Sequence, residues 1–135
     1  MTRSDIVEIV TGRVASVRLG PNEDLSEGLD QAAAQLGFRR ALVRSGLGSL
    51  IDATLQDGAG ALRTFSGPAI ELLSLSGELS LEDEGESARS VGLSGVIGDT
   101  TGAVWAGRLA PGQNLVCITM EIVLEEILVA PDEAE

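Results

Sequence analysis

The sequence lacks histidine and has a single cysteine, Cys117. No intrachain disulfide can therefore form. Histidine is the usual metal ligand and the usual acid or base near neutral pH, so most familiar catalytic arrangements are excluded. We expect no catalytic residues, no metal and no other cofactor. Because Cys117 lies between Val116 and Ile118, we expect its thiol to be buried and unreactive.

Aromatic and basic residues are also scarce. Phe38, Phe65 and Trp105 are the only aromatic residues, so the core has to be built from aliphatic side chains. All nine basic residues are arginines, against 21 carboxylates, which gives a formal net charge of −12. This acidic protein should repel a phosphate backbone, so nucleic acid is not an expected partner.

Long hydrophobic runs are missing as well. The longest candidate, residues 114–130, is interrupted by Glu121, Glu125 and Glu126. No charged-then-apolar segment opens the chain. We therefore expect a cytoplasmic protein without membrane contact, and a length of 135 residues suits a single domain.

The hydrophobic patterns that are present predict one helix and several strands. Alternation and β-branched residues predict strands at residues 13–19, 40–44, 50–55, 70–81, 91–97, 103–109 and 115–129. The helix is predicted over residues 22–37, with Asn22 as its N-terminal cap and Gly37 as its C-terminal cap. Its apolar face comprises Leu25, Leu29, Ala32, Ala33 and Leu36. The predicted fold is α+β, with a single helix packed on a mostly antiparallel multi-stranded sheet.

The strand at residues 70–81 carries the clearest alternation. Leu73, Leu75, Gly77, Leu79 and Leu81 are predicted to share one face, opposite Leu72, Ser74, Ser76, Glu78 and Ser80. Reversals are predicted at Asp57-Gly58 and at residues 98–102.

Other segments allow two interpretations. Residues 1–11 form either an edge strand or a loosely held arm. The Ser-Gly-Leu-Gly-Ser run at residues 45–49 predicts a flexible turn, since a phosphate-binding loop would need the Walker lysine. Acidic residues 82–86 predict a solvated loop rather than a metal site. The tail at 131–135 is expected to be flexible.

The order of several motifs resembles the PPC (plants and prokaryotes conserved) family, whose domain accompanies AT-hooks in plants. Residues 21–25, Pro-Asn-Glu-Asp-Leu, are similar to the family's P-G-E-D-L, and residues 45–50, 53–55 and 71–77 continue the likeness. Residues 107–109, Gly-Arg-Leu, stand where the family has G-G-H-L, and residues 119–123 resemble its closing strand. The likeness covers about residues 13–128. It implies a PPC-like fold and a homotrimer assembled through its sheets.

The family's histidine cluster is missing from this chain. Many prokaryotic members carry H-x-H before the G-G-H-L histidine, and these positions fall on Ala88, Ser90 and Arg108. Alanine offers no ligand, serine is a poor one and arginine remains a cation, so we predict no metal there. The R-G-R-P hook of the plant members is missing too.

Arg108 allows two interpretations, a structural ion pair with Glu71 or Glu121, or an anion site. The ion pair is the simpler one. We hypothesise that Arg108 with Ser90, and Trp105 as a wall, lines a small pocket near a subunit boundary. Glu71 and Glu121 are further candidates, because they are charges inside apolar strands.

Three functions follow from these observations, in decreasing order of expectation. The first is a non-enzymatic, trimeric interaction or regulatory module that meets a protein partner. The second is a small anionic-ligand sensor that uses Arg108. The third is DNA binding, which the family label suggests but the net charge disfavours.

Overall fold

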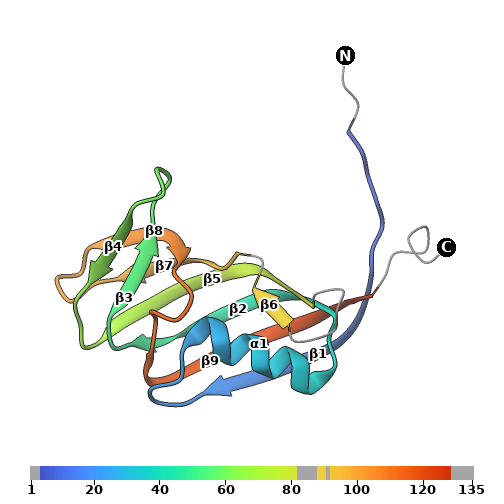
Figure 1. The fold of residues 1–135 in the computed structure, drawn as a ribbon, viewed down its shortest axis with the longest axis horizontal. Coiled ribbons are helices and arrows are strands. Elements are labelled where there is room, and N and C mark those ends of the chain that lie inside the picture. Colours follow the sequence, from blue (N-terminus) through green and yellow to red (C-terminus); the bar gives the residue numbers. More distant parts are fainter. Residues whose placement is uncertain (1–3, 82–87, 91, 129–135) are drawn as a thin grey trace.

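The computed structural model describes residues 4–81, 88–90 and 92–128, which form one helix and one sheet (Figure 1). The elements in chain order are β1 (Val10–Leu19), α1 (Leu25–Leu36), β2 (Arg40–Leu50), β3 (Ala53–Gln56), β4 (Leu62–Phe65), β5 (Ile70–Leu81), β6 (Ala88–Ser90), β7 (Ser94–Gly98), β8 (Val104–Leu109) and β9 (Val116–Leu128). The strand order is β1-β9-β2-β5-β7-β8-β3-β4, with β6 beside β5, and the pairings are antiparallel. The predicted α+β fold is confirmed, although β4 and β6 were not predicted.

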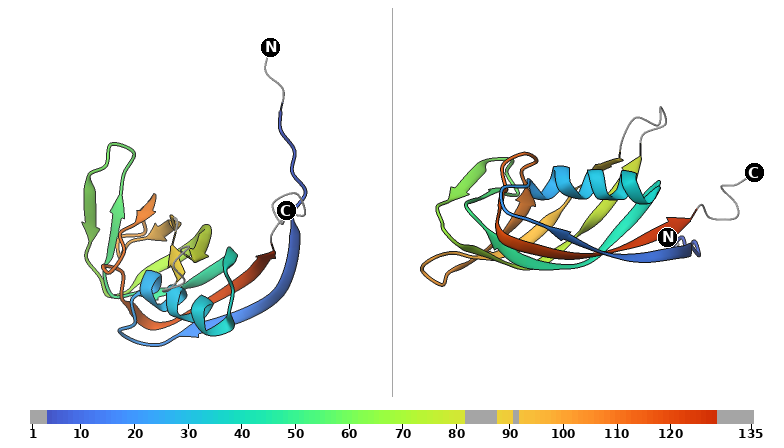
Figure 2. Two further views of the ribbon diagram at one scale, coloured as in Figure 1. Left: turned by 45° about the vertical axis from the view of Figure 1, so that its right-hand side comes forward. Right: turned by 90° about the horizontal axis from the view of Figure 1, so that it is seen from below.

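The sheet curves around α1, which lies on its concave side (Figure 2). We call the face toward α1 the inner face and the opposite one the outer face. The inner face is aliphatic: Leu25 and Leu29 of α1 are fully buried, as are Ile122 and Leu124 of β9. Burial of these side chains is the main force that holds the helix on the sheet.

Helix α1 begins at Leu25, and its N-terminal cap is Asp24 rather than the predicted Asn22. The Asp24 side chain accepts a hydrogen bond from the Glu27 N–H at 3.0 Å. Asn22 instead has a φ of 71° in the preceding turn. Asp24 takes the cap because its carboxylate also accepts the Asn114 and Gly112 N–H groups, which fix it in place. Gly37 is the C-terminal cap, as predicted.

The turn predicted at residues 45–49 is wrong, because β2 continues through it from Arg40 to Leu50. The two glycines serve close packing instead. A Cβ at Gly46 would meet Leu75, and one at Gly48 would meet the backbone of Thr119. Glycine inside a strand often marks such an approach of another backbone. The phosphate-loop interpretation is therefore wrong as well.

Strand β5 has the predicted bounds, but the prediction of its faces is wrong in part. Leu72 and Leu75 are both buried, whereas Leu73 is 50% exposed. The pairing with β7 shifts register between Leu72 and Ser74. Such a β-bulge adds one residue and reverses the alternation of side chains. Leu73 therefore lies on the outer face beside Ser74, and the core continues from Leu72 to Leu75.

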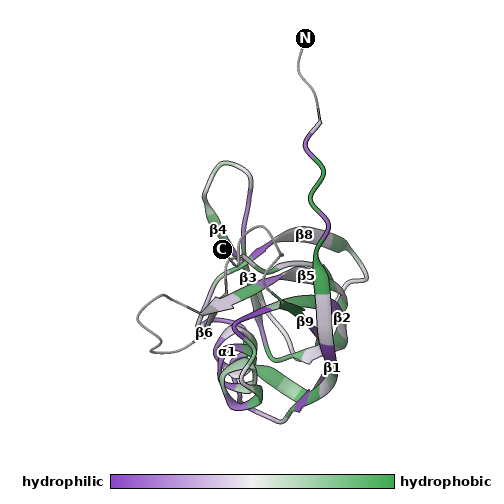
Figure 3. Cartoon of the chain, turned by 90° about the vertical axis from the view of Figure 1, so that its right-hand side faces the viewer, coloured by the Kyte–Doolittle hydropathy of each residue, from purple (hydrophilic) through white to green (hydrophobic). Residues whose placement is uncertain are grey.

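Residues 4–9 form an exposed arm, and β1 begins at Val10. Ile6 is 88% exposed, and hydrophobic and charged residues follow each other along this arm (Figure 3). Cys117 is half-buried rather than buried, because the next residue toward the N-terminus of β9, Val116, points into the core and alternation turns Cys117 the other way. The predictions for residues 82–86 and 131–135 lie outside the described residues. The one helix of the described residues, α1, is too short and too polar to span a membrane.

Candidate functional site

Arg108 lies on the outer face, because the next residue of β8, Leu109, is buried in the core and side chains alternate along a strand. Its backbone pairs with Ser94 of β7 and with Gln56 of β3. Ser94 pairs in turn with Ser76 of β5. Residues in cross-strand register share a face. Four polar side chains from four strands, those of Ser76, Ser94, Arg108 and Gln56, therefore form one row, which we call the polar row.

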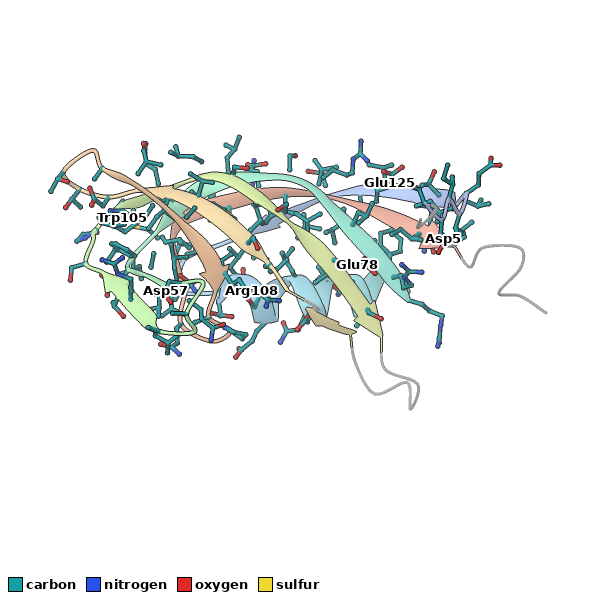
Figure 4. The ribbon with its side chains drawn as sticks, turned by 90° about the horizontal axis from the view of Figure 1, so that it is seen from above. Asp5, Asp57, Glu78, Trp105, Arg108 and Glu125 are labelled. Carbon is teal, nitrogen blue, oxygen red and sulfur yellow. The ribbon has the colours of Figure 1, made fainter. Side chains whose placement is uncertain are left out.

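The polar row borders a hollow of about 380 Å³. Gly95, Ala106 and Gly107 line it, and their small size leaves the space open. The Arg108 guanidinium lies against Gly92, where a Cβ would meet Nη2. Asp57 also lines the hollow, and Figure 4 shows Arg108, Asp57 and Trp105 at one end of the sheet and Asp5 and Glu125 at the other.

Within the described part of the chain, no ion pair joins Arg108 to Glu71 or Glu121. Glu121 pairs with Arg18 across β1 and β9, with Nη2 to Oε2 at 2.8 Å. Glu71 is exposed and lines a second hollow of about 460 Å³, together with Leu47 and Leu73. The simpler interpretation of Arg108, an ion pair with either glutamate, therefore does not describe this structure.

Trp105 does not wall the hollow beside Arg108. Its ring packs against the core and against Phe65, with ring centroids 5.1 Å apart. The Arg63 guanidinium lies 4.8 Å from its ring centroid. Ser90 pairs with Leu79 through the backbone of β6, so it lies on a strand that does not neighbour β8. Among the predicted site residues, Glu71, Glu121 and Trp105 therefore do not join Arg108 at the hollow.

Asp99 holds β8 in place at the start of the strand that carries Arg108. Its Oδ1 accepts hydrogen bonds from the Thr101 hydroxyl at 2.7 Å and from the Thr101 and Ala103 N–H groups at 2.9 Å. Its Oδ2 accepts one from the Trp105 indole at 2.9 Å. The Thr101 hydroxyl, followed by the Trp105 indole, lowers the pKa of Asp99 to about 2. The carboxylate is thus a structural acceptor.

The residues at the family's histidine positions do not fit a zinc-like metal ion. Ala88 and Ser90 lie on β6, and Arg108 brings a cation to the place where a third ligand would stand. Among the residues that the structure describes, no three His, Cys, Asp or Glu side chains gather as a metal site. No step of a metal-dependent reaction follows from this arrangement.

Sequence reasoning missed Ser76, Ser94 and Gln56 as neighbours of Arg108, and it missed Ser74 at the edge of the hollow. The alternation in β5 did place Ser74 and Ser76 on one face. Their position next to Arg108 depends on the pairing of β5, β7 and β8, which periodicity within each strand does not contain.

The chain is similar to a known domain family and to segments of larger proteins. The profile of the Plants and Prokaryotes Conserved (PCC) domain matches residues 8–128. The bifunctional protein GlmU of two Synechococcus strains is 34% and 32% identical over 116 and 114 residues. These matches cover 86% and 84% of this chain but 17% of each GlmU, so the chain spans a small part of the curated relatives it matches.

Two solved structures share the fold. A hypothetical protein from Salmonella enterica is 25% identical with a TM-score of 0.73, over 93% of this chain and 83% of its own. A plant- and prokaryote-conserved protein from Pyrococcus horikoshii is 23% identical with a TM-score of 0.74, over 93% of this chain and 86% of its own.

Proposed function

The chain belongs to the Plants and Prokaryotes Conserved domain family, and from that premise we propose that it is a non-enzymatic interaction domain that assembles as a homotrimer. In this proposal the outer face of the sheet mediates self-association, and the acidic remainder of the surface meets a protein partner. The trimer is the assembly that the family resemblance implies.

The observation that carries this proposal is the uncovered apolar surface on the outer face. Leu47 on β2 and Leu73 on β5 are 62% and 50% exposed. Both line the hollow of about 460 Å³ that also contains Ser49, Glu71 and Thr119. We call this set the outer patch. Helix α1 covers only the inner face, and exposed apolar patches with a polar rim are typical of protein interfaces.

Local charge around the outer patch suits a second copy of the chain. A formal net charge of −12 makes two copies repel each other in general. On the outer face, however, arginines neutralise carboxylates: Arg18 pairs at 2.8 Å with Glu121, which lies opposite Leu47, and Arg44 pairs with Glu125 at 3.1 Å. These pairs reduce the repulsion between two outer faces that approach each other.

The proposal of a non-enzymatic domain is supported by two carboxylates that accept hydrogen bonds within the fold. Asp24 caps α1 and binds two further backbone N–H groups, and Asp99 accepts four hydrogen bonds. Neither is left to act as a base. The Synechococcus relatives, in which a similar segment is 17% of a larger protein, also support a role as an attached domain.

DNA binding is the weaker candidate. Arg18 and Arg44 on the outer face are already paired with glutamates, and the net charge opposes a phosphate backbone. A small-ligand function rests on the other hollow, beside Arg108.

The proposal is tested by native mass spectrometry of the wild type and of Leu47→Asp. We expect a trimer for the wild type and dissociation to the monomer for Leu47→Asp, since a carboxylate would be buried without a partner. Leu62→Asp is the matched control, because Leu62 on β4 is 55% exposed but lies outside the outer patch. A monomeric wild type, or equal dissociation of both variants, would overturn the proposal.

A further inference from the structure

We propose that the hollow beside Arg108 binds a small carboxylate, with the Arg108 guanidinium as its charged anchor and the hydroxyls of Ser76 and Ser94 as neutral donors. This binding site goes beyond the self-association proposed above. It lies on the same face of the sheet, across β5, β7, β8 and β3, and shares no lining residue with the hollow of the outer patch.

The guanidinium of Arg108 is available to a ligand. In the described part of the chain, Arg13, Arg18, Arg40 and Arg44 form ion pairs and Arg63 stacks on Trp105. Arg108 has neither kind of partner there. A planar guanidinium presents paired N–H donors in the geometry of a carboxylate. Because Arg108 lines the hollow and forms no ion pair with a described residue, it can anchor an anion there.

The neutral donors stand next to this anchor. Ser94 is directly opposite Arg108, and Ser76 is directly opposite Ser94. Neighbouring strands are about 4.8 Å apart, so one small anion can span the guanidinium and the adjacent hydroxyl. The hydroxyls of Ser74, Ser76 and Ser94 bind no other described residue.

The shape of the hollow is built into the strands. Gly95 and Gly107 contribute only backbone to its wall, and a Cβ on Gly107 would meet the backbone of Gln56. Gly92 leaves the room in which the guanidinium lies. A volume of about 380 Å³ is at the small end of ligand pockets and suits a small metabolite.

Asp57 restricts the charge of the ligand. Its Oδ1 accepts the Ala59 and Ala61 N–H groups, both at 2.9 Å, which fixes this carboxylate at the edge of the hollow. Its negative charge offsets part of the attraction of Arg108. A ligand with one negative charge is therefore favoured over one with two, which points to a carboxylate rather than to phosphate.

The test is a titration of ¹⁵N-labelled protein with sodium acetate at constant ionic strength, followed by NMR up to about 50 mM, a range that reaches affinities weaker than millimolar. We expect saturable shifts of the Ser76, Ser94 and Arg108 amides. Arg108→Ala should weaken this binding about tenfold or more, as expected for loss of a charged hydrogen-bond donor. Inorganic phosphate should bind more weakly than acetate.

Two further variants separate a built site from general electrostatics. Arg39→Ala removes the same charge from an exposed arginine that has no partner among the described residues, and it should leave acetate binding unchanged. Ser94→Asp keeps Arg108 but places a carboxylate directly opposite it, and it should abolish binding. The proposal is overturned by the absence of saturable shifts, by equal effects of Arg39→Ala and Arg108→Ala, or by tighter binding of phosphate than acetate.

Discussion

The two halves of the sheet are stabilised in different ways. Strands β1, β9, β2 and β5 are long and lie in the half next to α1, where they bury aliphatic side chains such as Leu79, Met120 and Leu124. Strands β7, β8, β3 and β4 contain four to six residues each. We call these the helix half and the hairpin half.

The hairpin half depends on local polar chemistry. Its two hairpins, β3–β4 and β7–β8, use the same device: Asp57 and Asp99 accept hydrogen bonds from the N–H groups two and four residues later. In both, a glycine three residues after the aspartate has a positive φ, 88° at Gly60 and 90° at Gly102. The comparison teaches that short strands with little area to bury need turns whose conformation is fixed by sequence.

A buried polar network connects the two halves, and breaking it should have the largest effect. Asn114 is fully buried and bonds the Thr54 N–H at 2.9 Å, the Thr54 carbonyl at 3.1 Å and the Ala110 carbonyl at 3.0 Å. Asn114→Ala leaves these groups without partners, and we expect a loss of about 3–6 kcal/mol of unfolding free energy. Urea unfolding measures it, with exposed Gln113→Ala as the control. A loss below about 1 kcal/mol would contradict the role of the network.

The helix half should respond most to loss of buried area. Leu124 is fully buried in the core, and Leu124→Ala should cost about 2–5 kcal/mol of unfolding free energy. Leu62→Ala removes the same atoms from a side chain that is 55% exposed, and it should cost a small fraction of that. Similar losses in the two variants would refute the distinction between the halves.

In the hairpin half, a substitution that restricts the backbone of a turn should lower the unfolding free energy even where it changes no side-chain contact. Gly102 has a φ of 90°, and a Cβ there would meet nothing within 4 Å. Gly102→Ala should therefore destabilise the protein by about 1–2 kcal/mol through conformation alone. Gly58→Ala in the other hairpin is the control, because Gly58 has equally open space and no positive φ. Equal stability of the two variants would contradict this explanation.

The smallest expected effect is the pH dependence from Asp99, because solvent screens this group. Its pKa is about 2 in the folded chain, lowered from 3.8, so the stabilisation is complete above about pH 4 and is lost as pH falls through 2. The unfolding free energy of the wild type should therefore fall more than that of Asp99→Asn between pH 4 and pH 2. Thr101→Val removes the hydrogen bond that lowers the pKa of Asp99 most. In this variant the loss of unfolding free energy should be complete at a higher pH. Parallel pH profiles for wild type and Asp99→Asn would exclude the contribution.

Sequence patterns predicted much of the fold and little of the candidate site. Strand β5 has the predicted bounds and β9 nearly so, since long alternating runs of β-branched and aliphatic residues are a local signal. The glycines of β2 were misinterpreted as a turn, because the neighbours that require them come from β5 and β9. The bulge in β5 was missed for the same reason.

By itself, the sequence determined the aliphatic core, the net charge of −12, the lack of imidazole ligands and the α+β fold. The tertiary structure alone decided that Ser76, Ser94, Arg108 and Gln56 share one row and that Glu121 pairs with Arg18 instead of Arg108. The physical reason is that alternation is set within a strand, whereas register is set by pairing between segments that lie far apart in the chain.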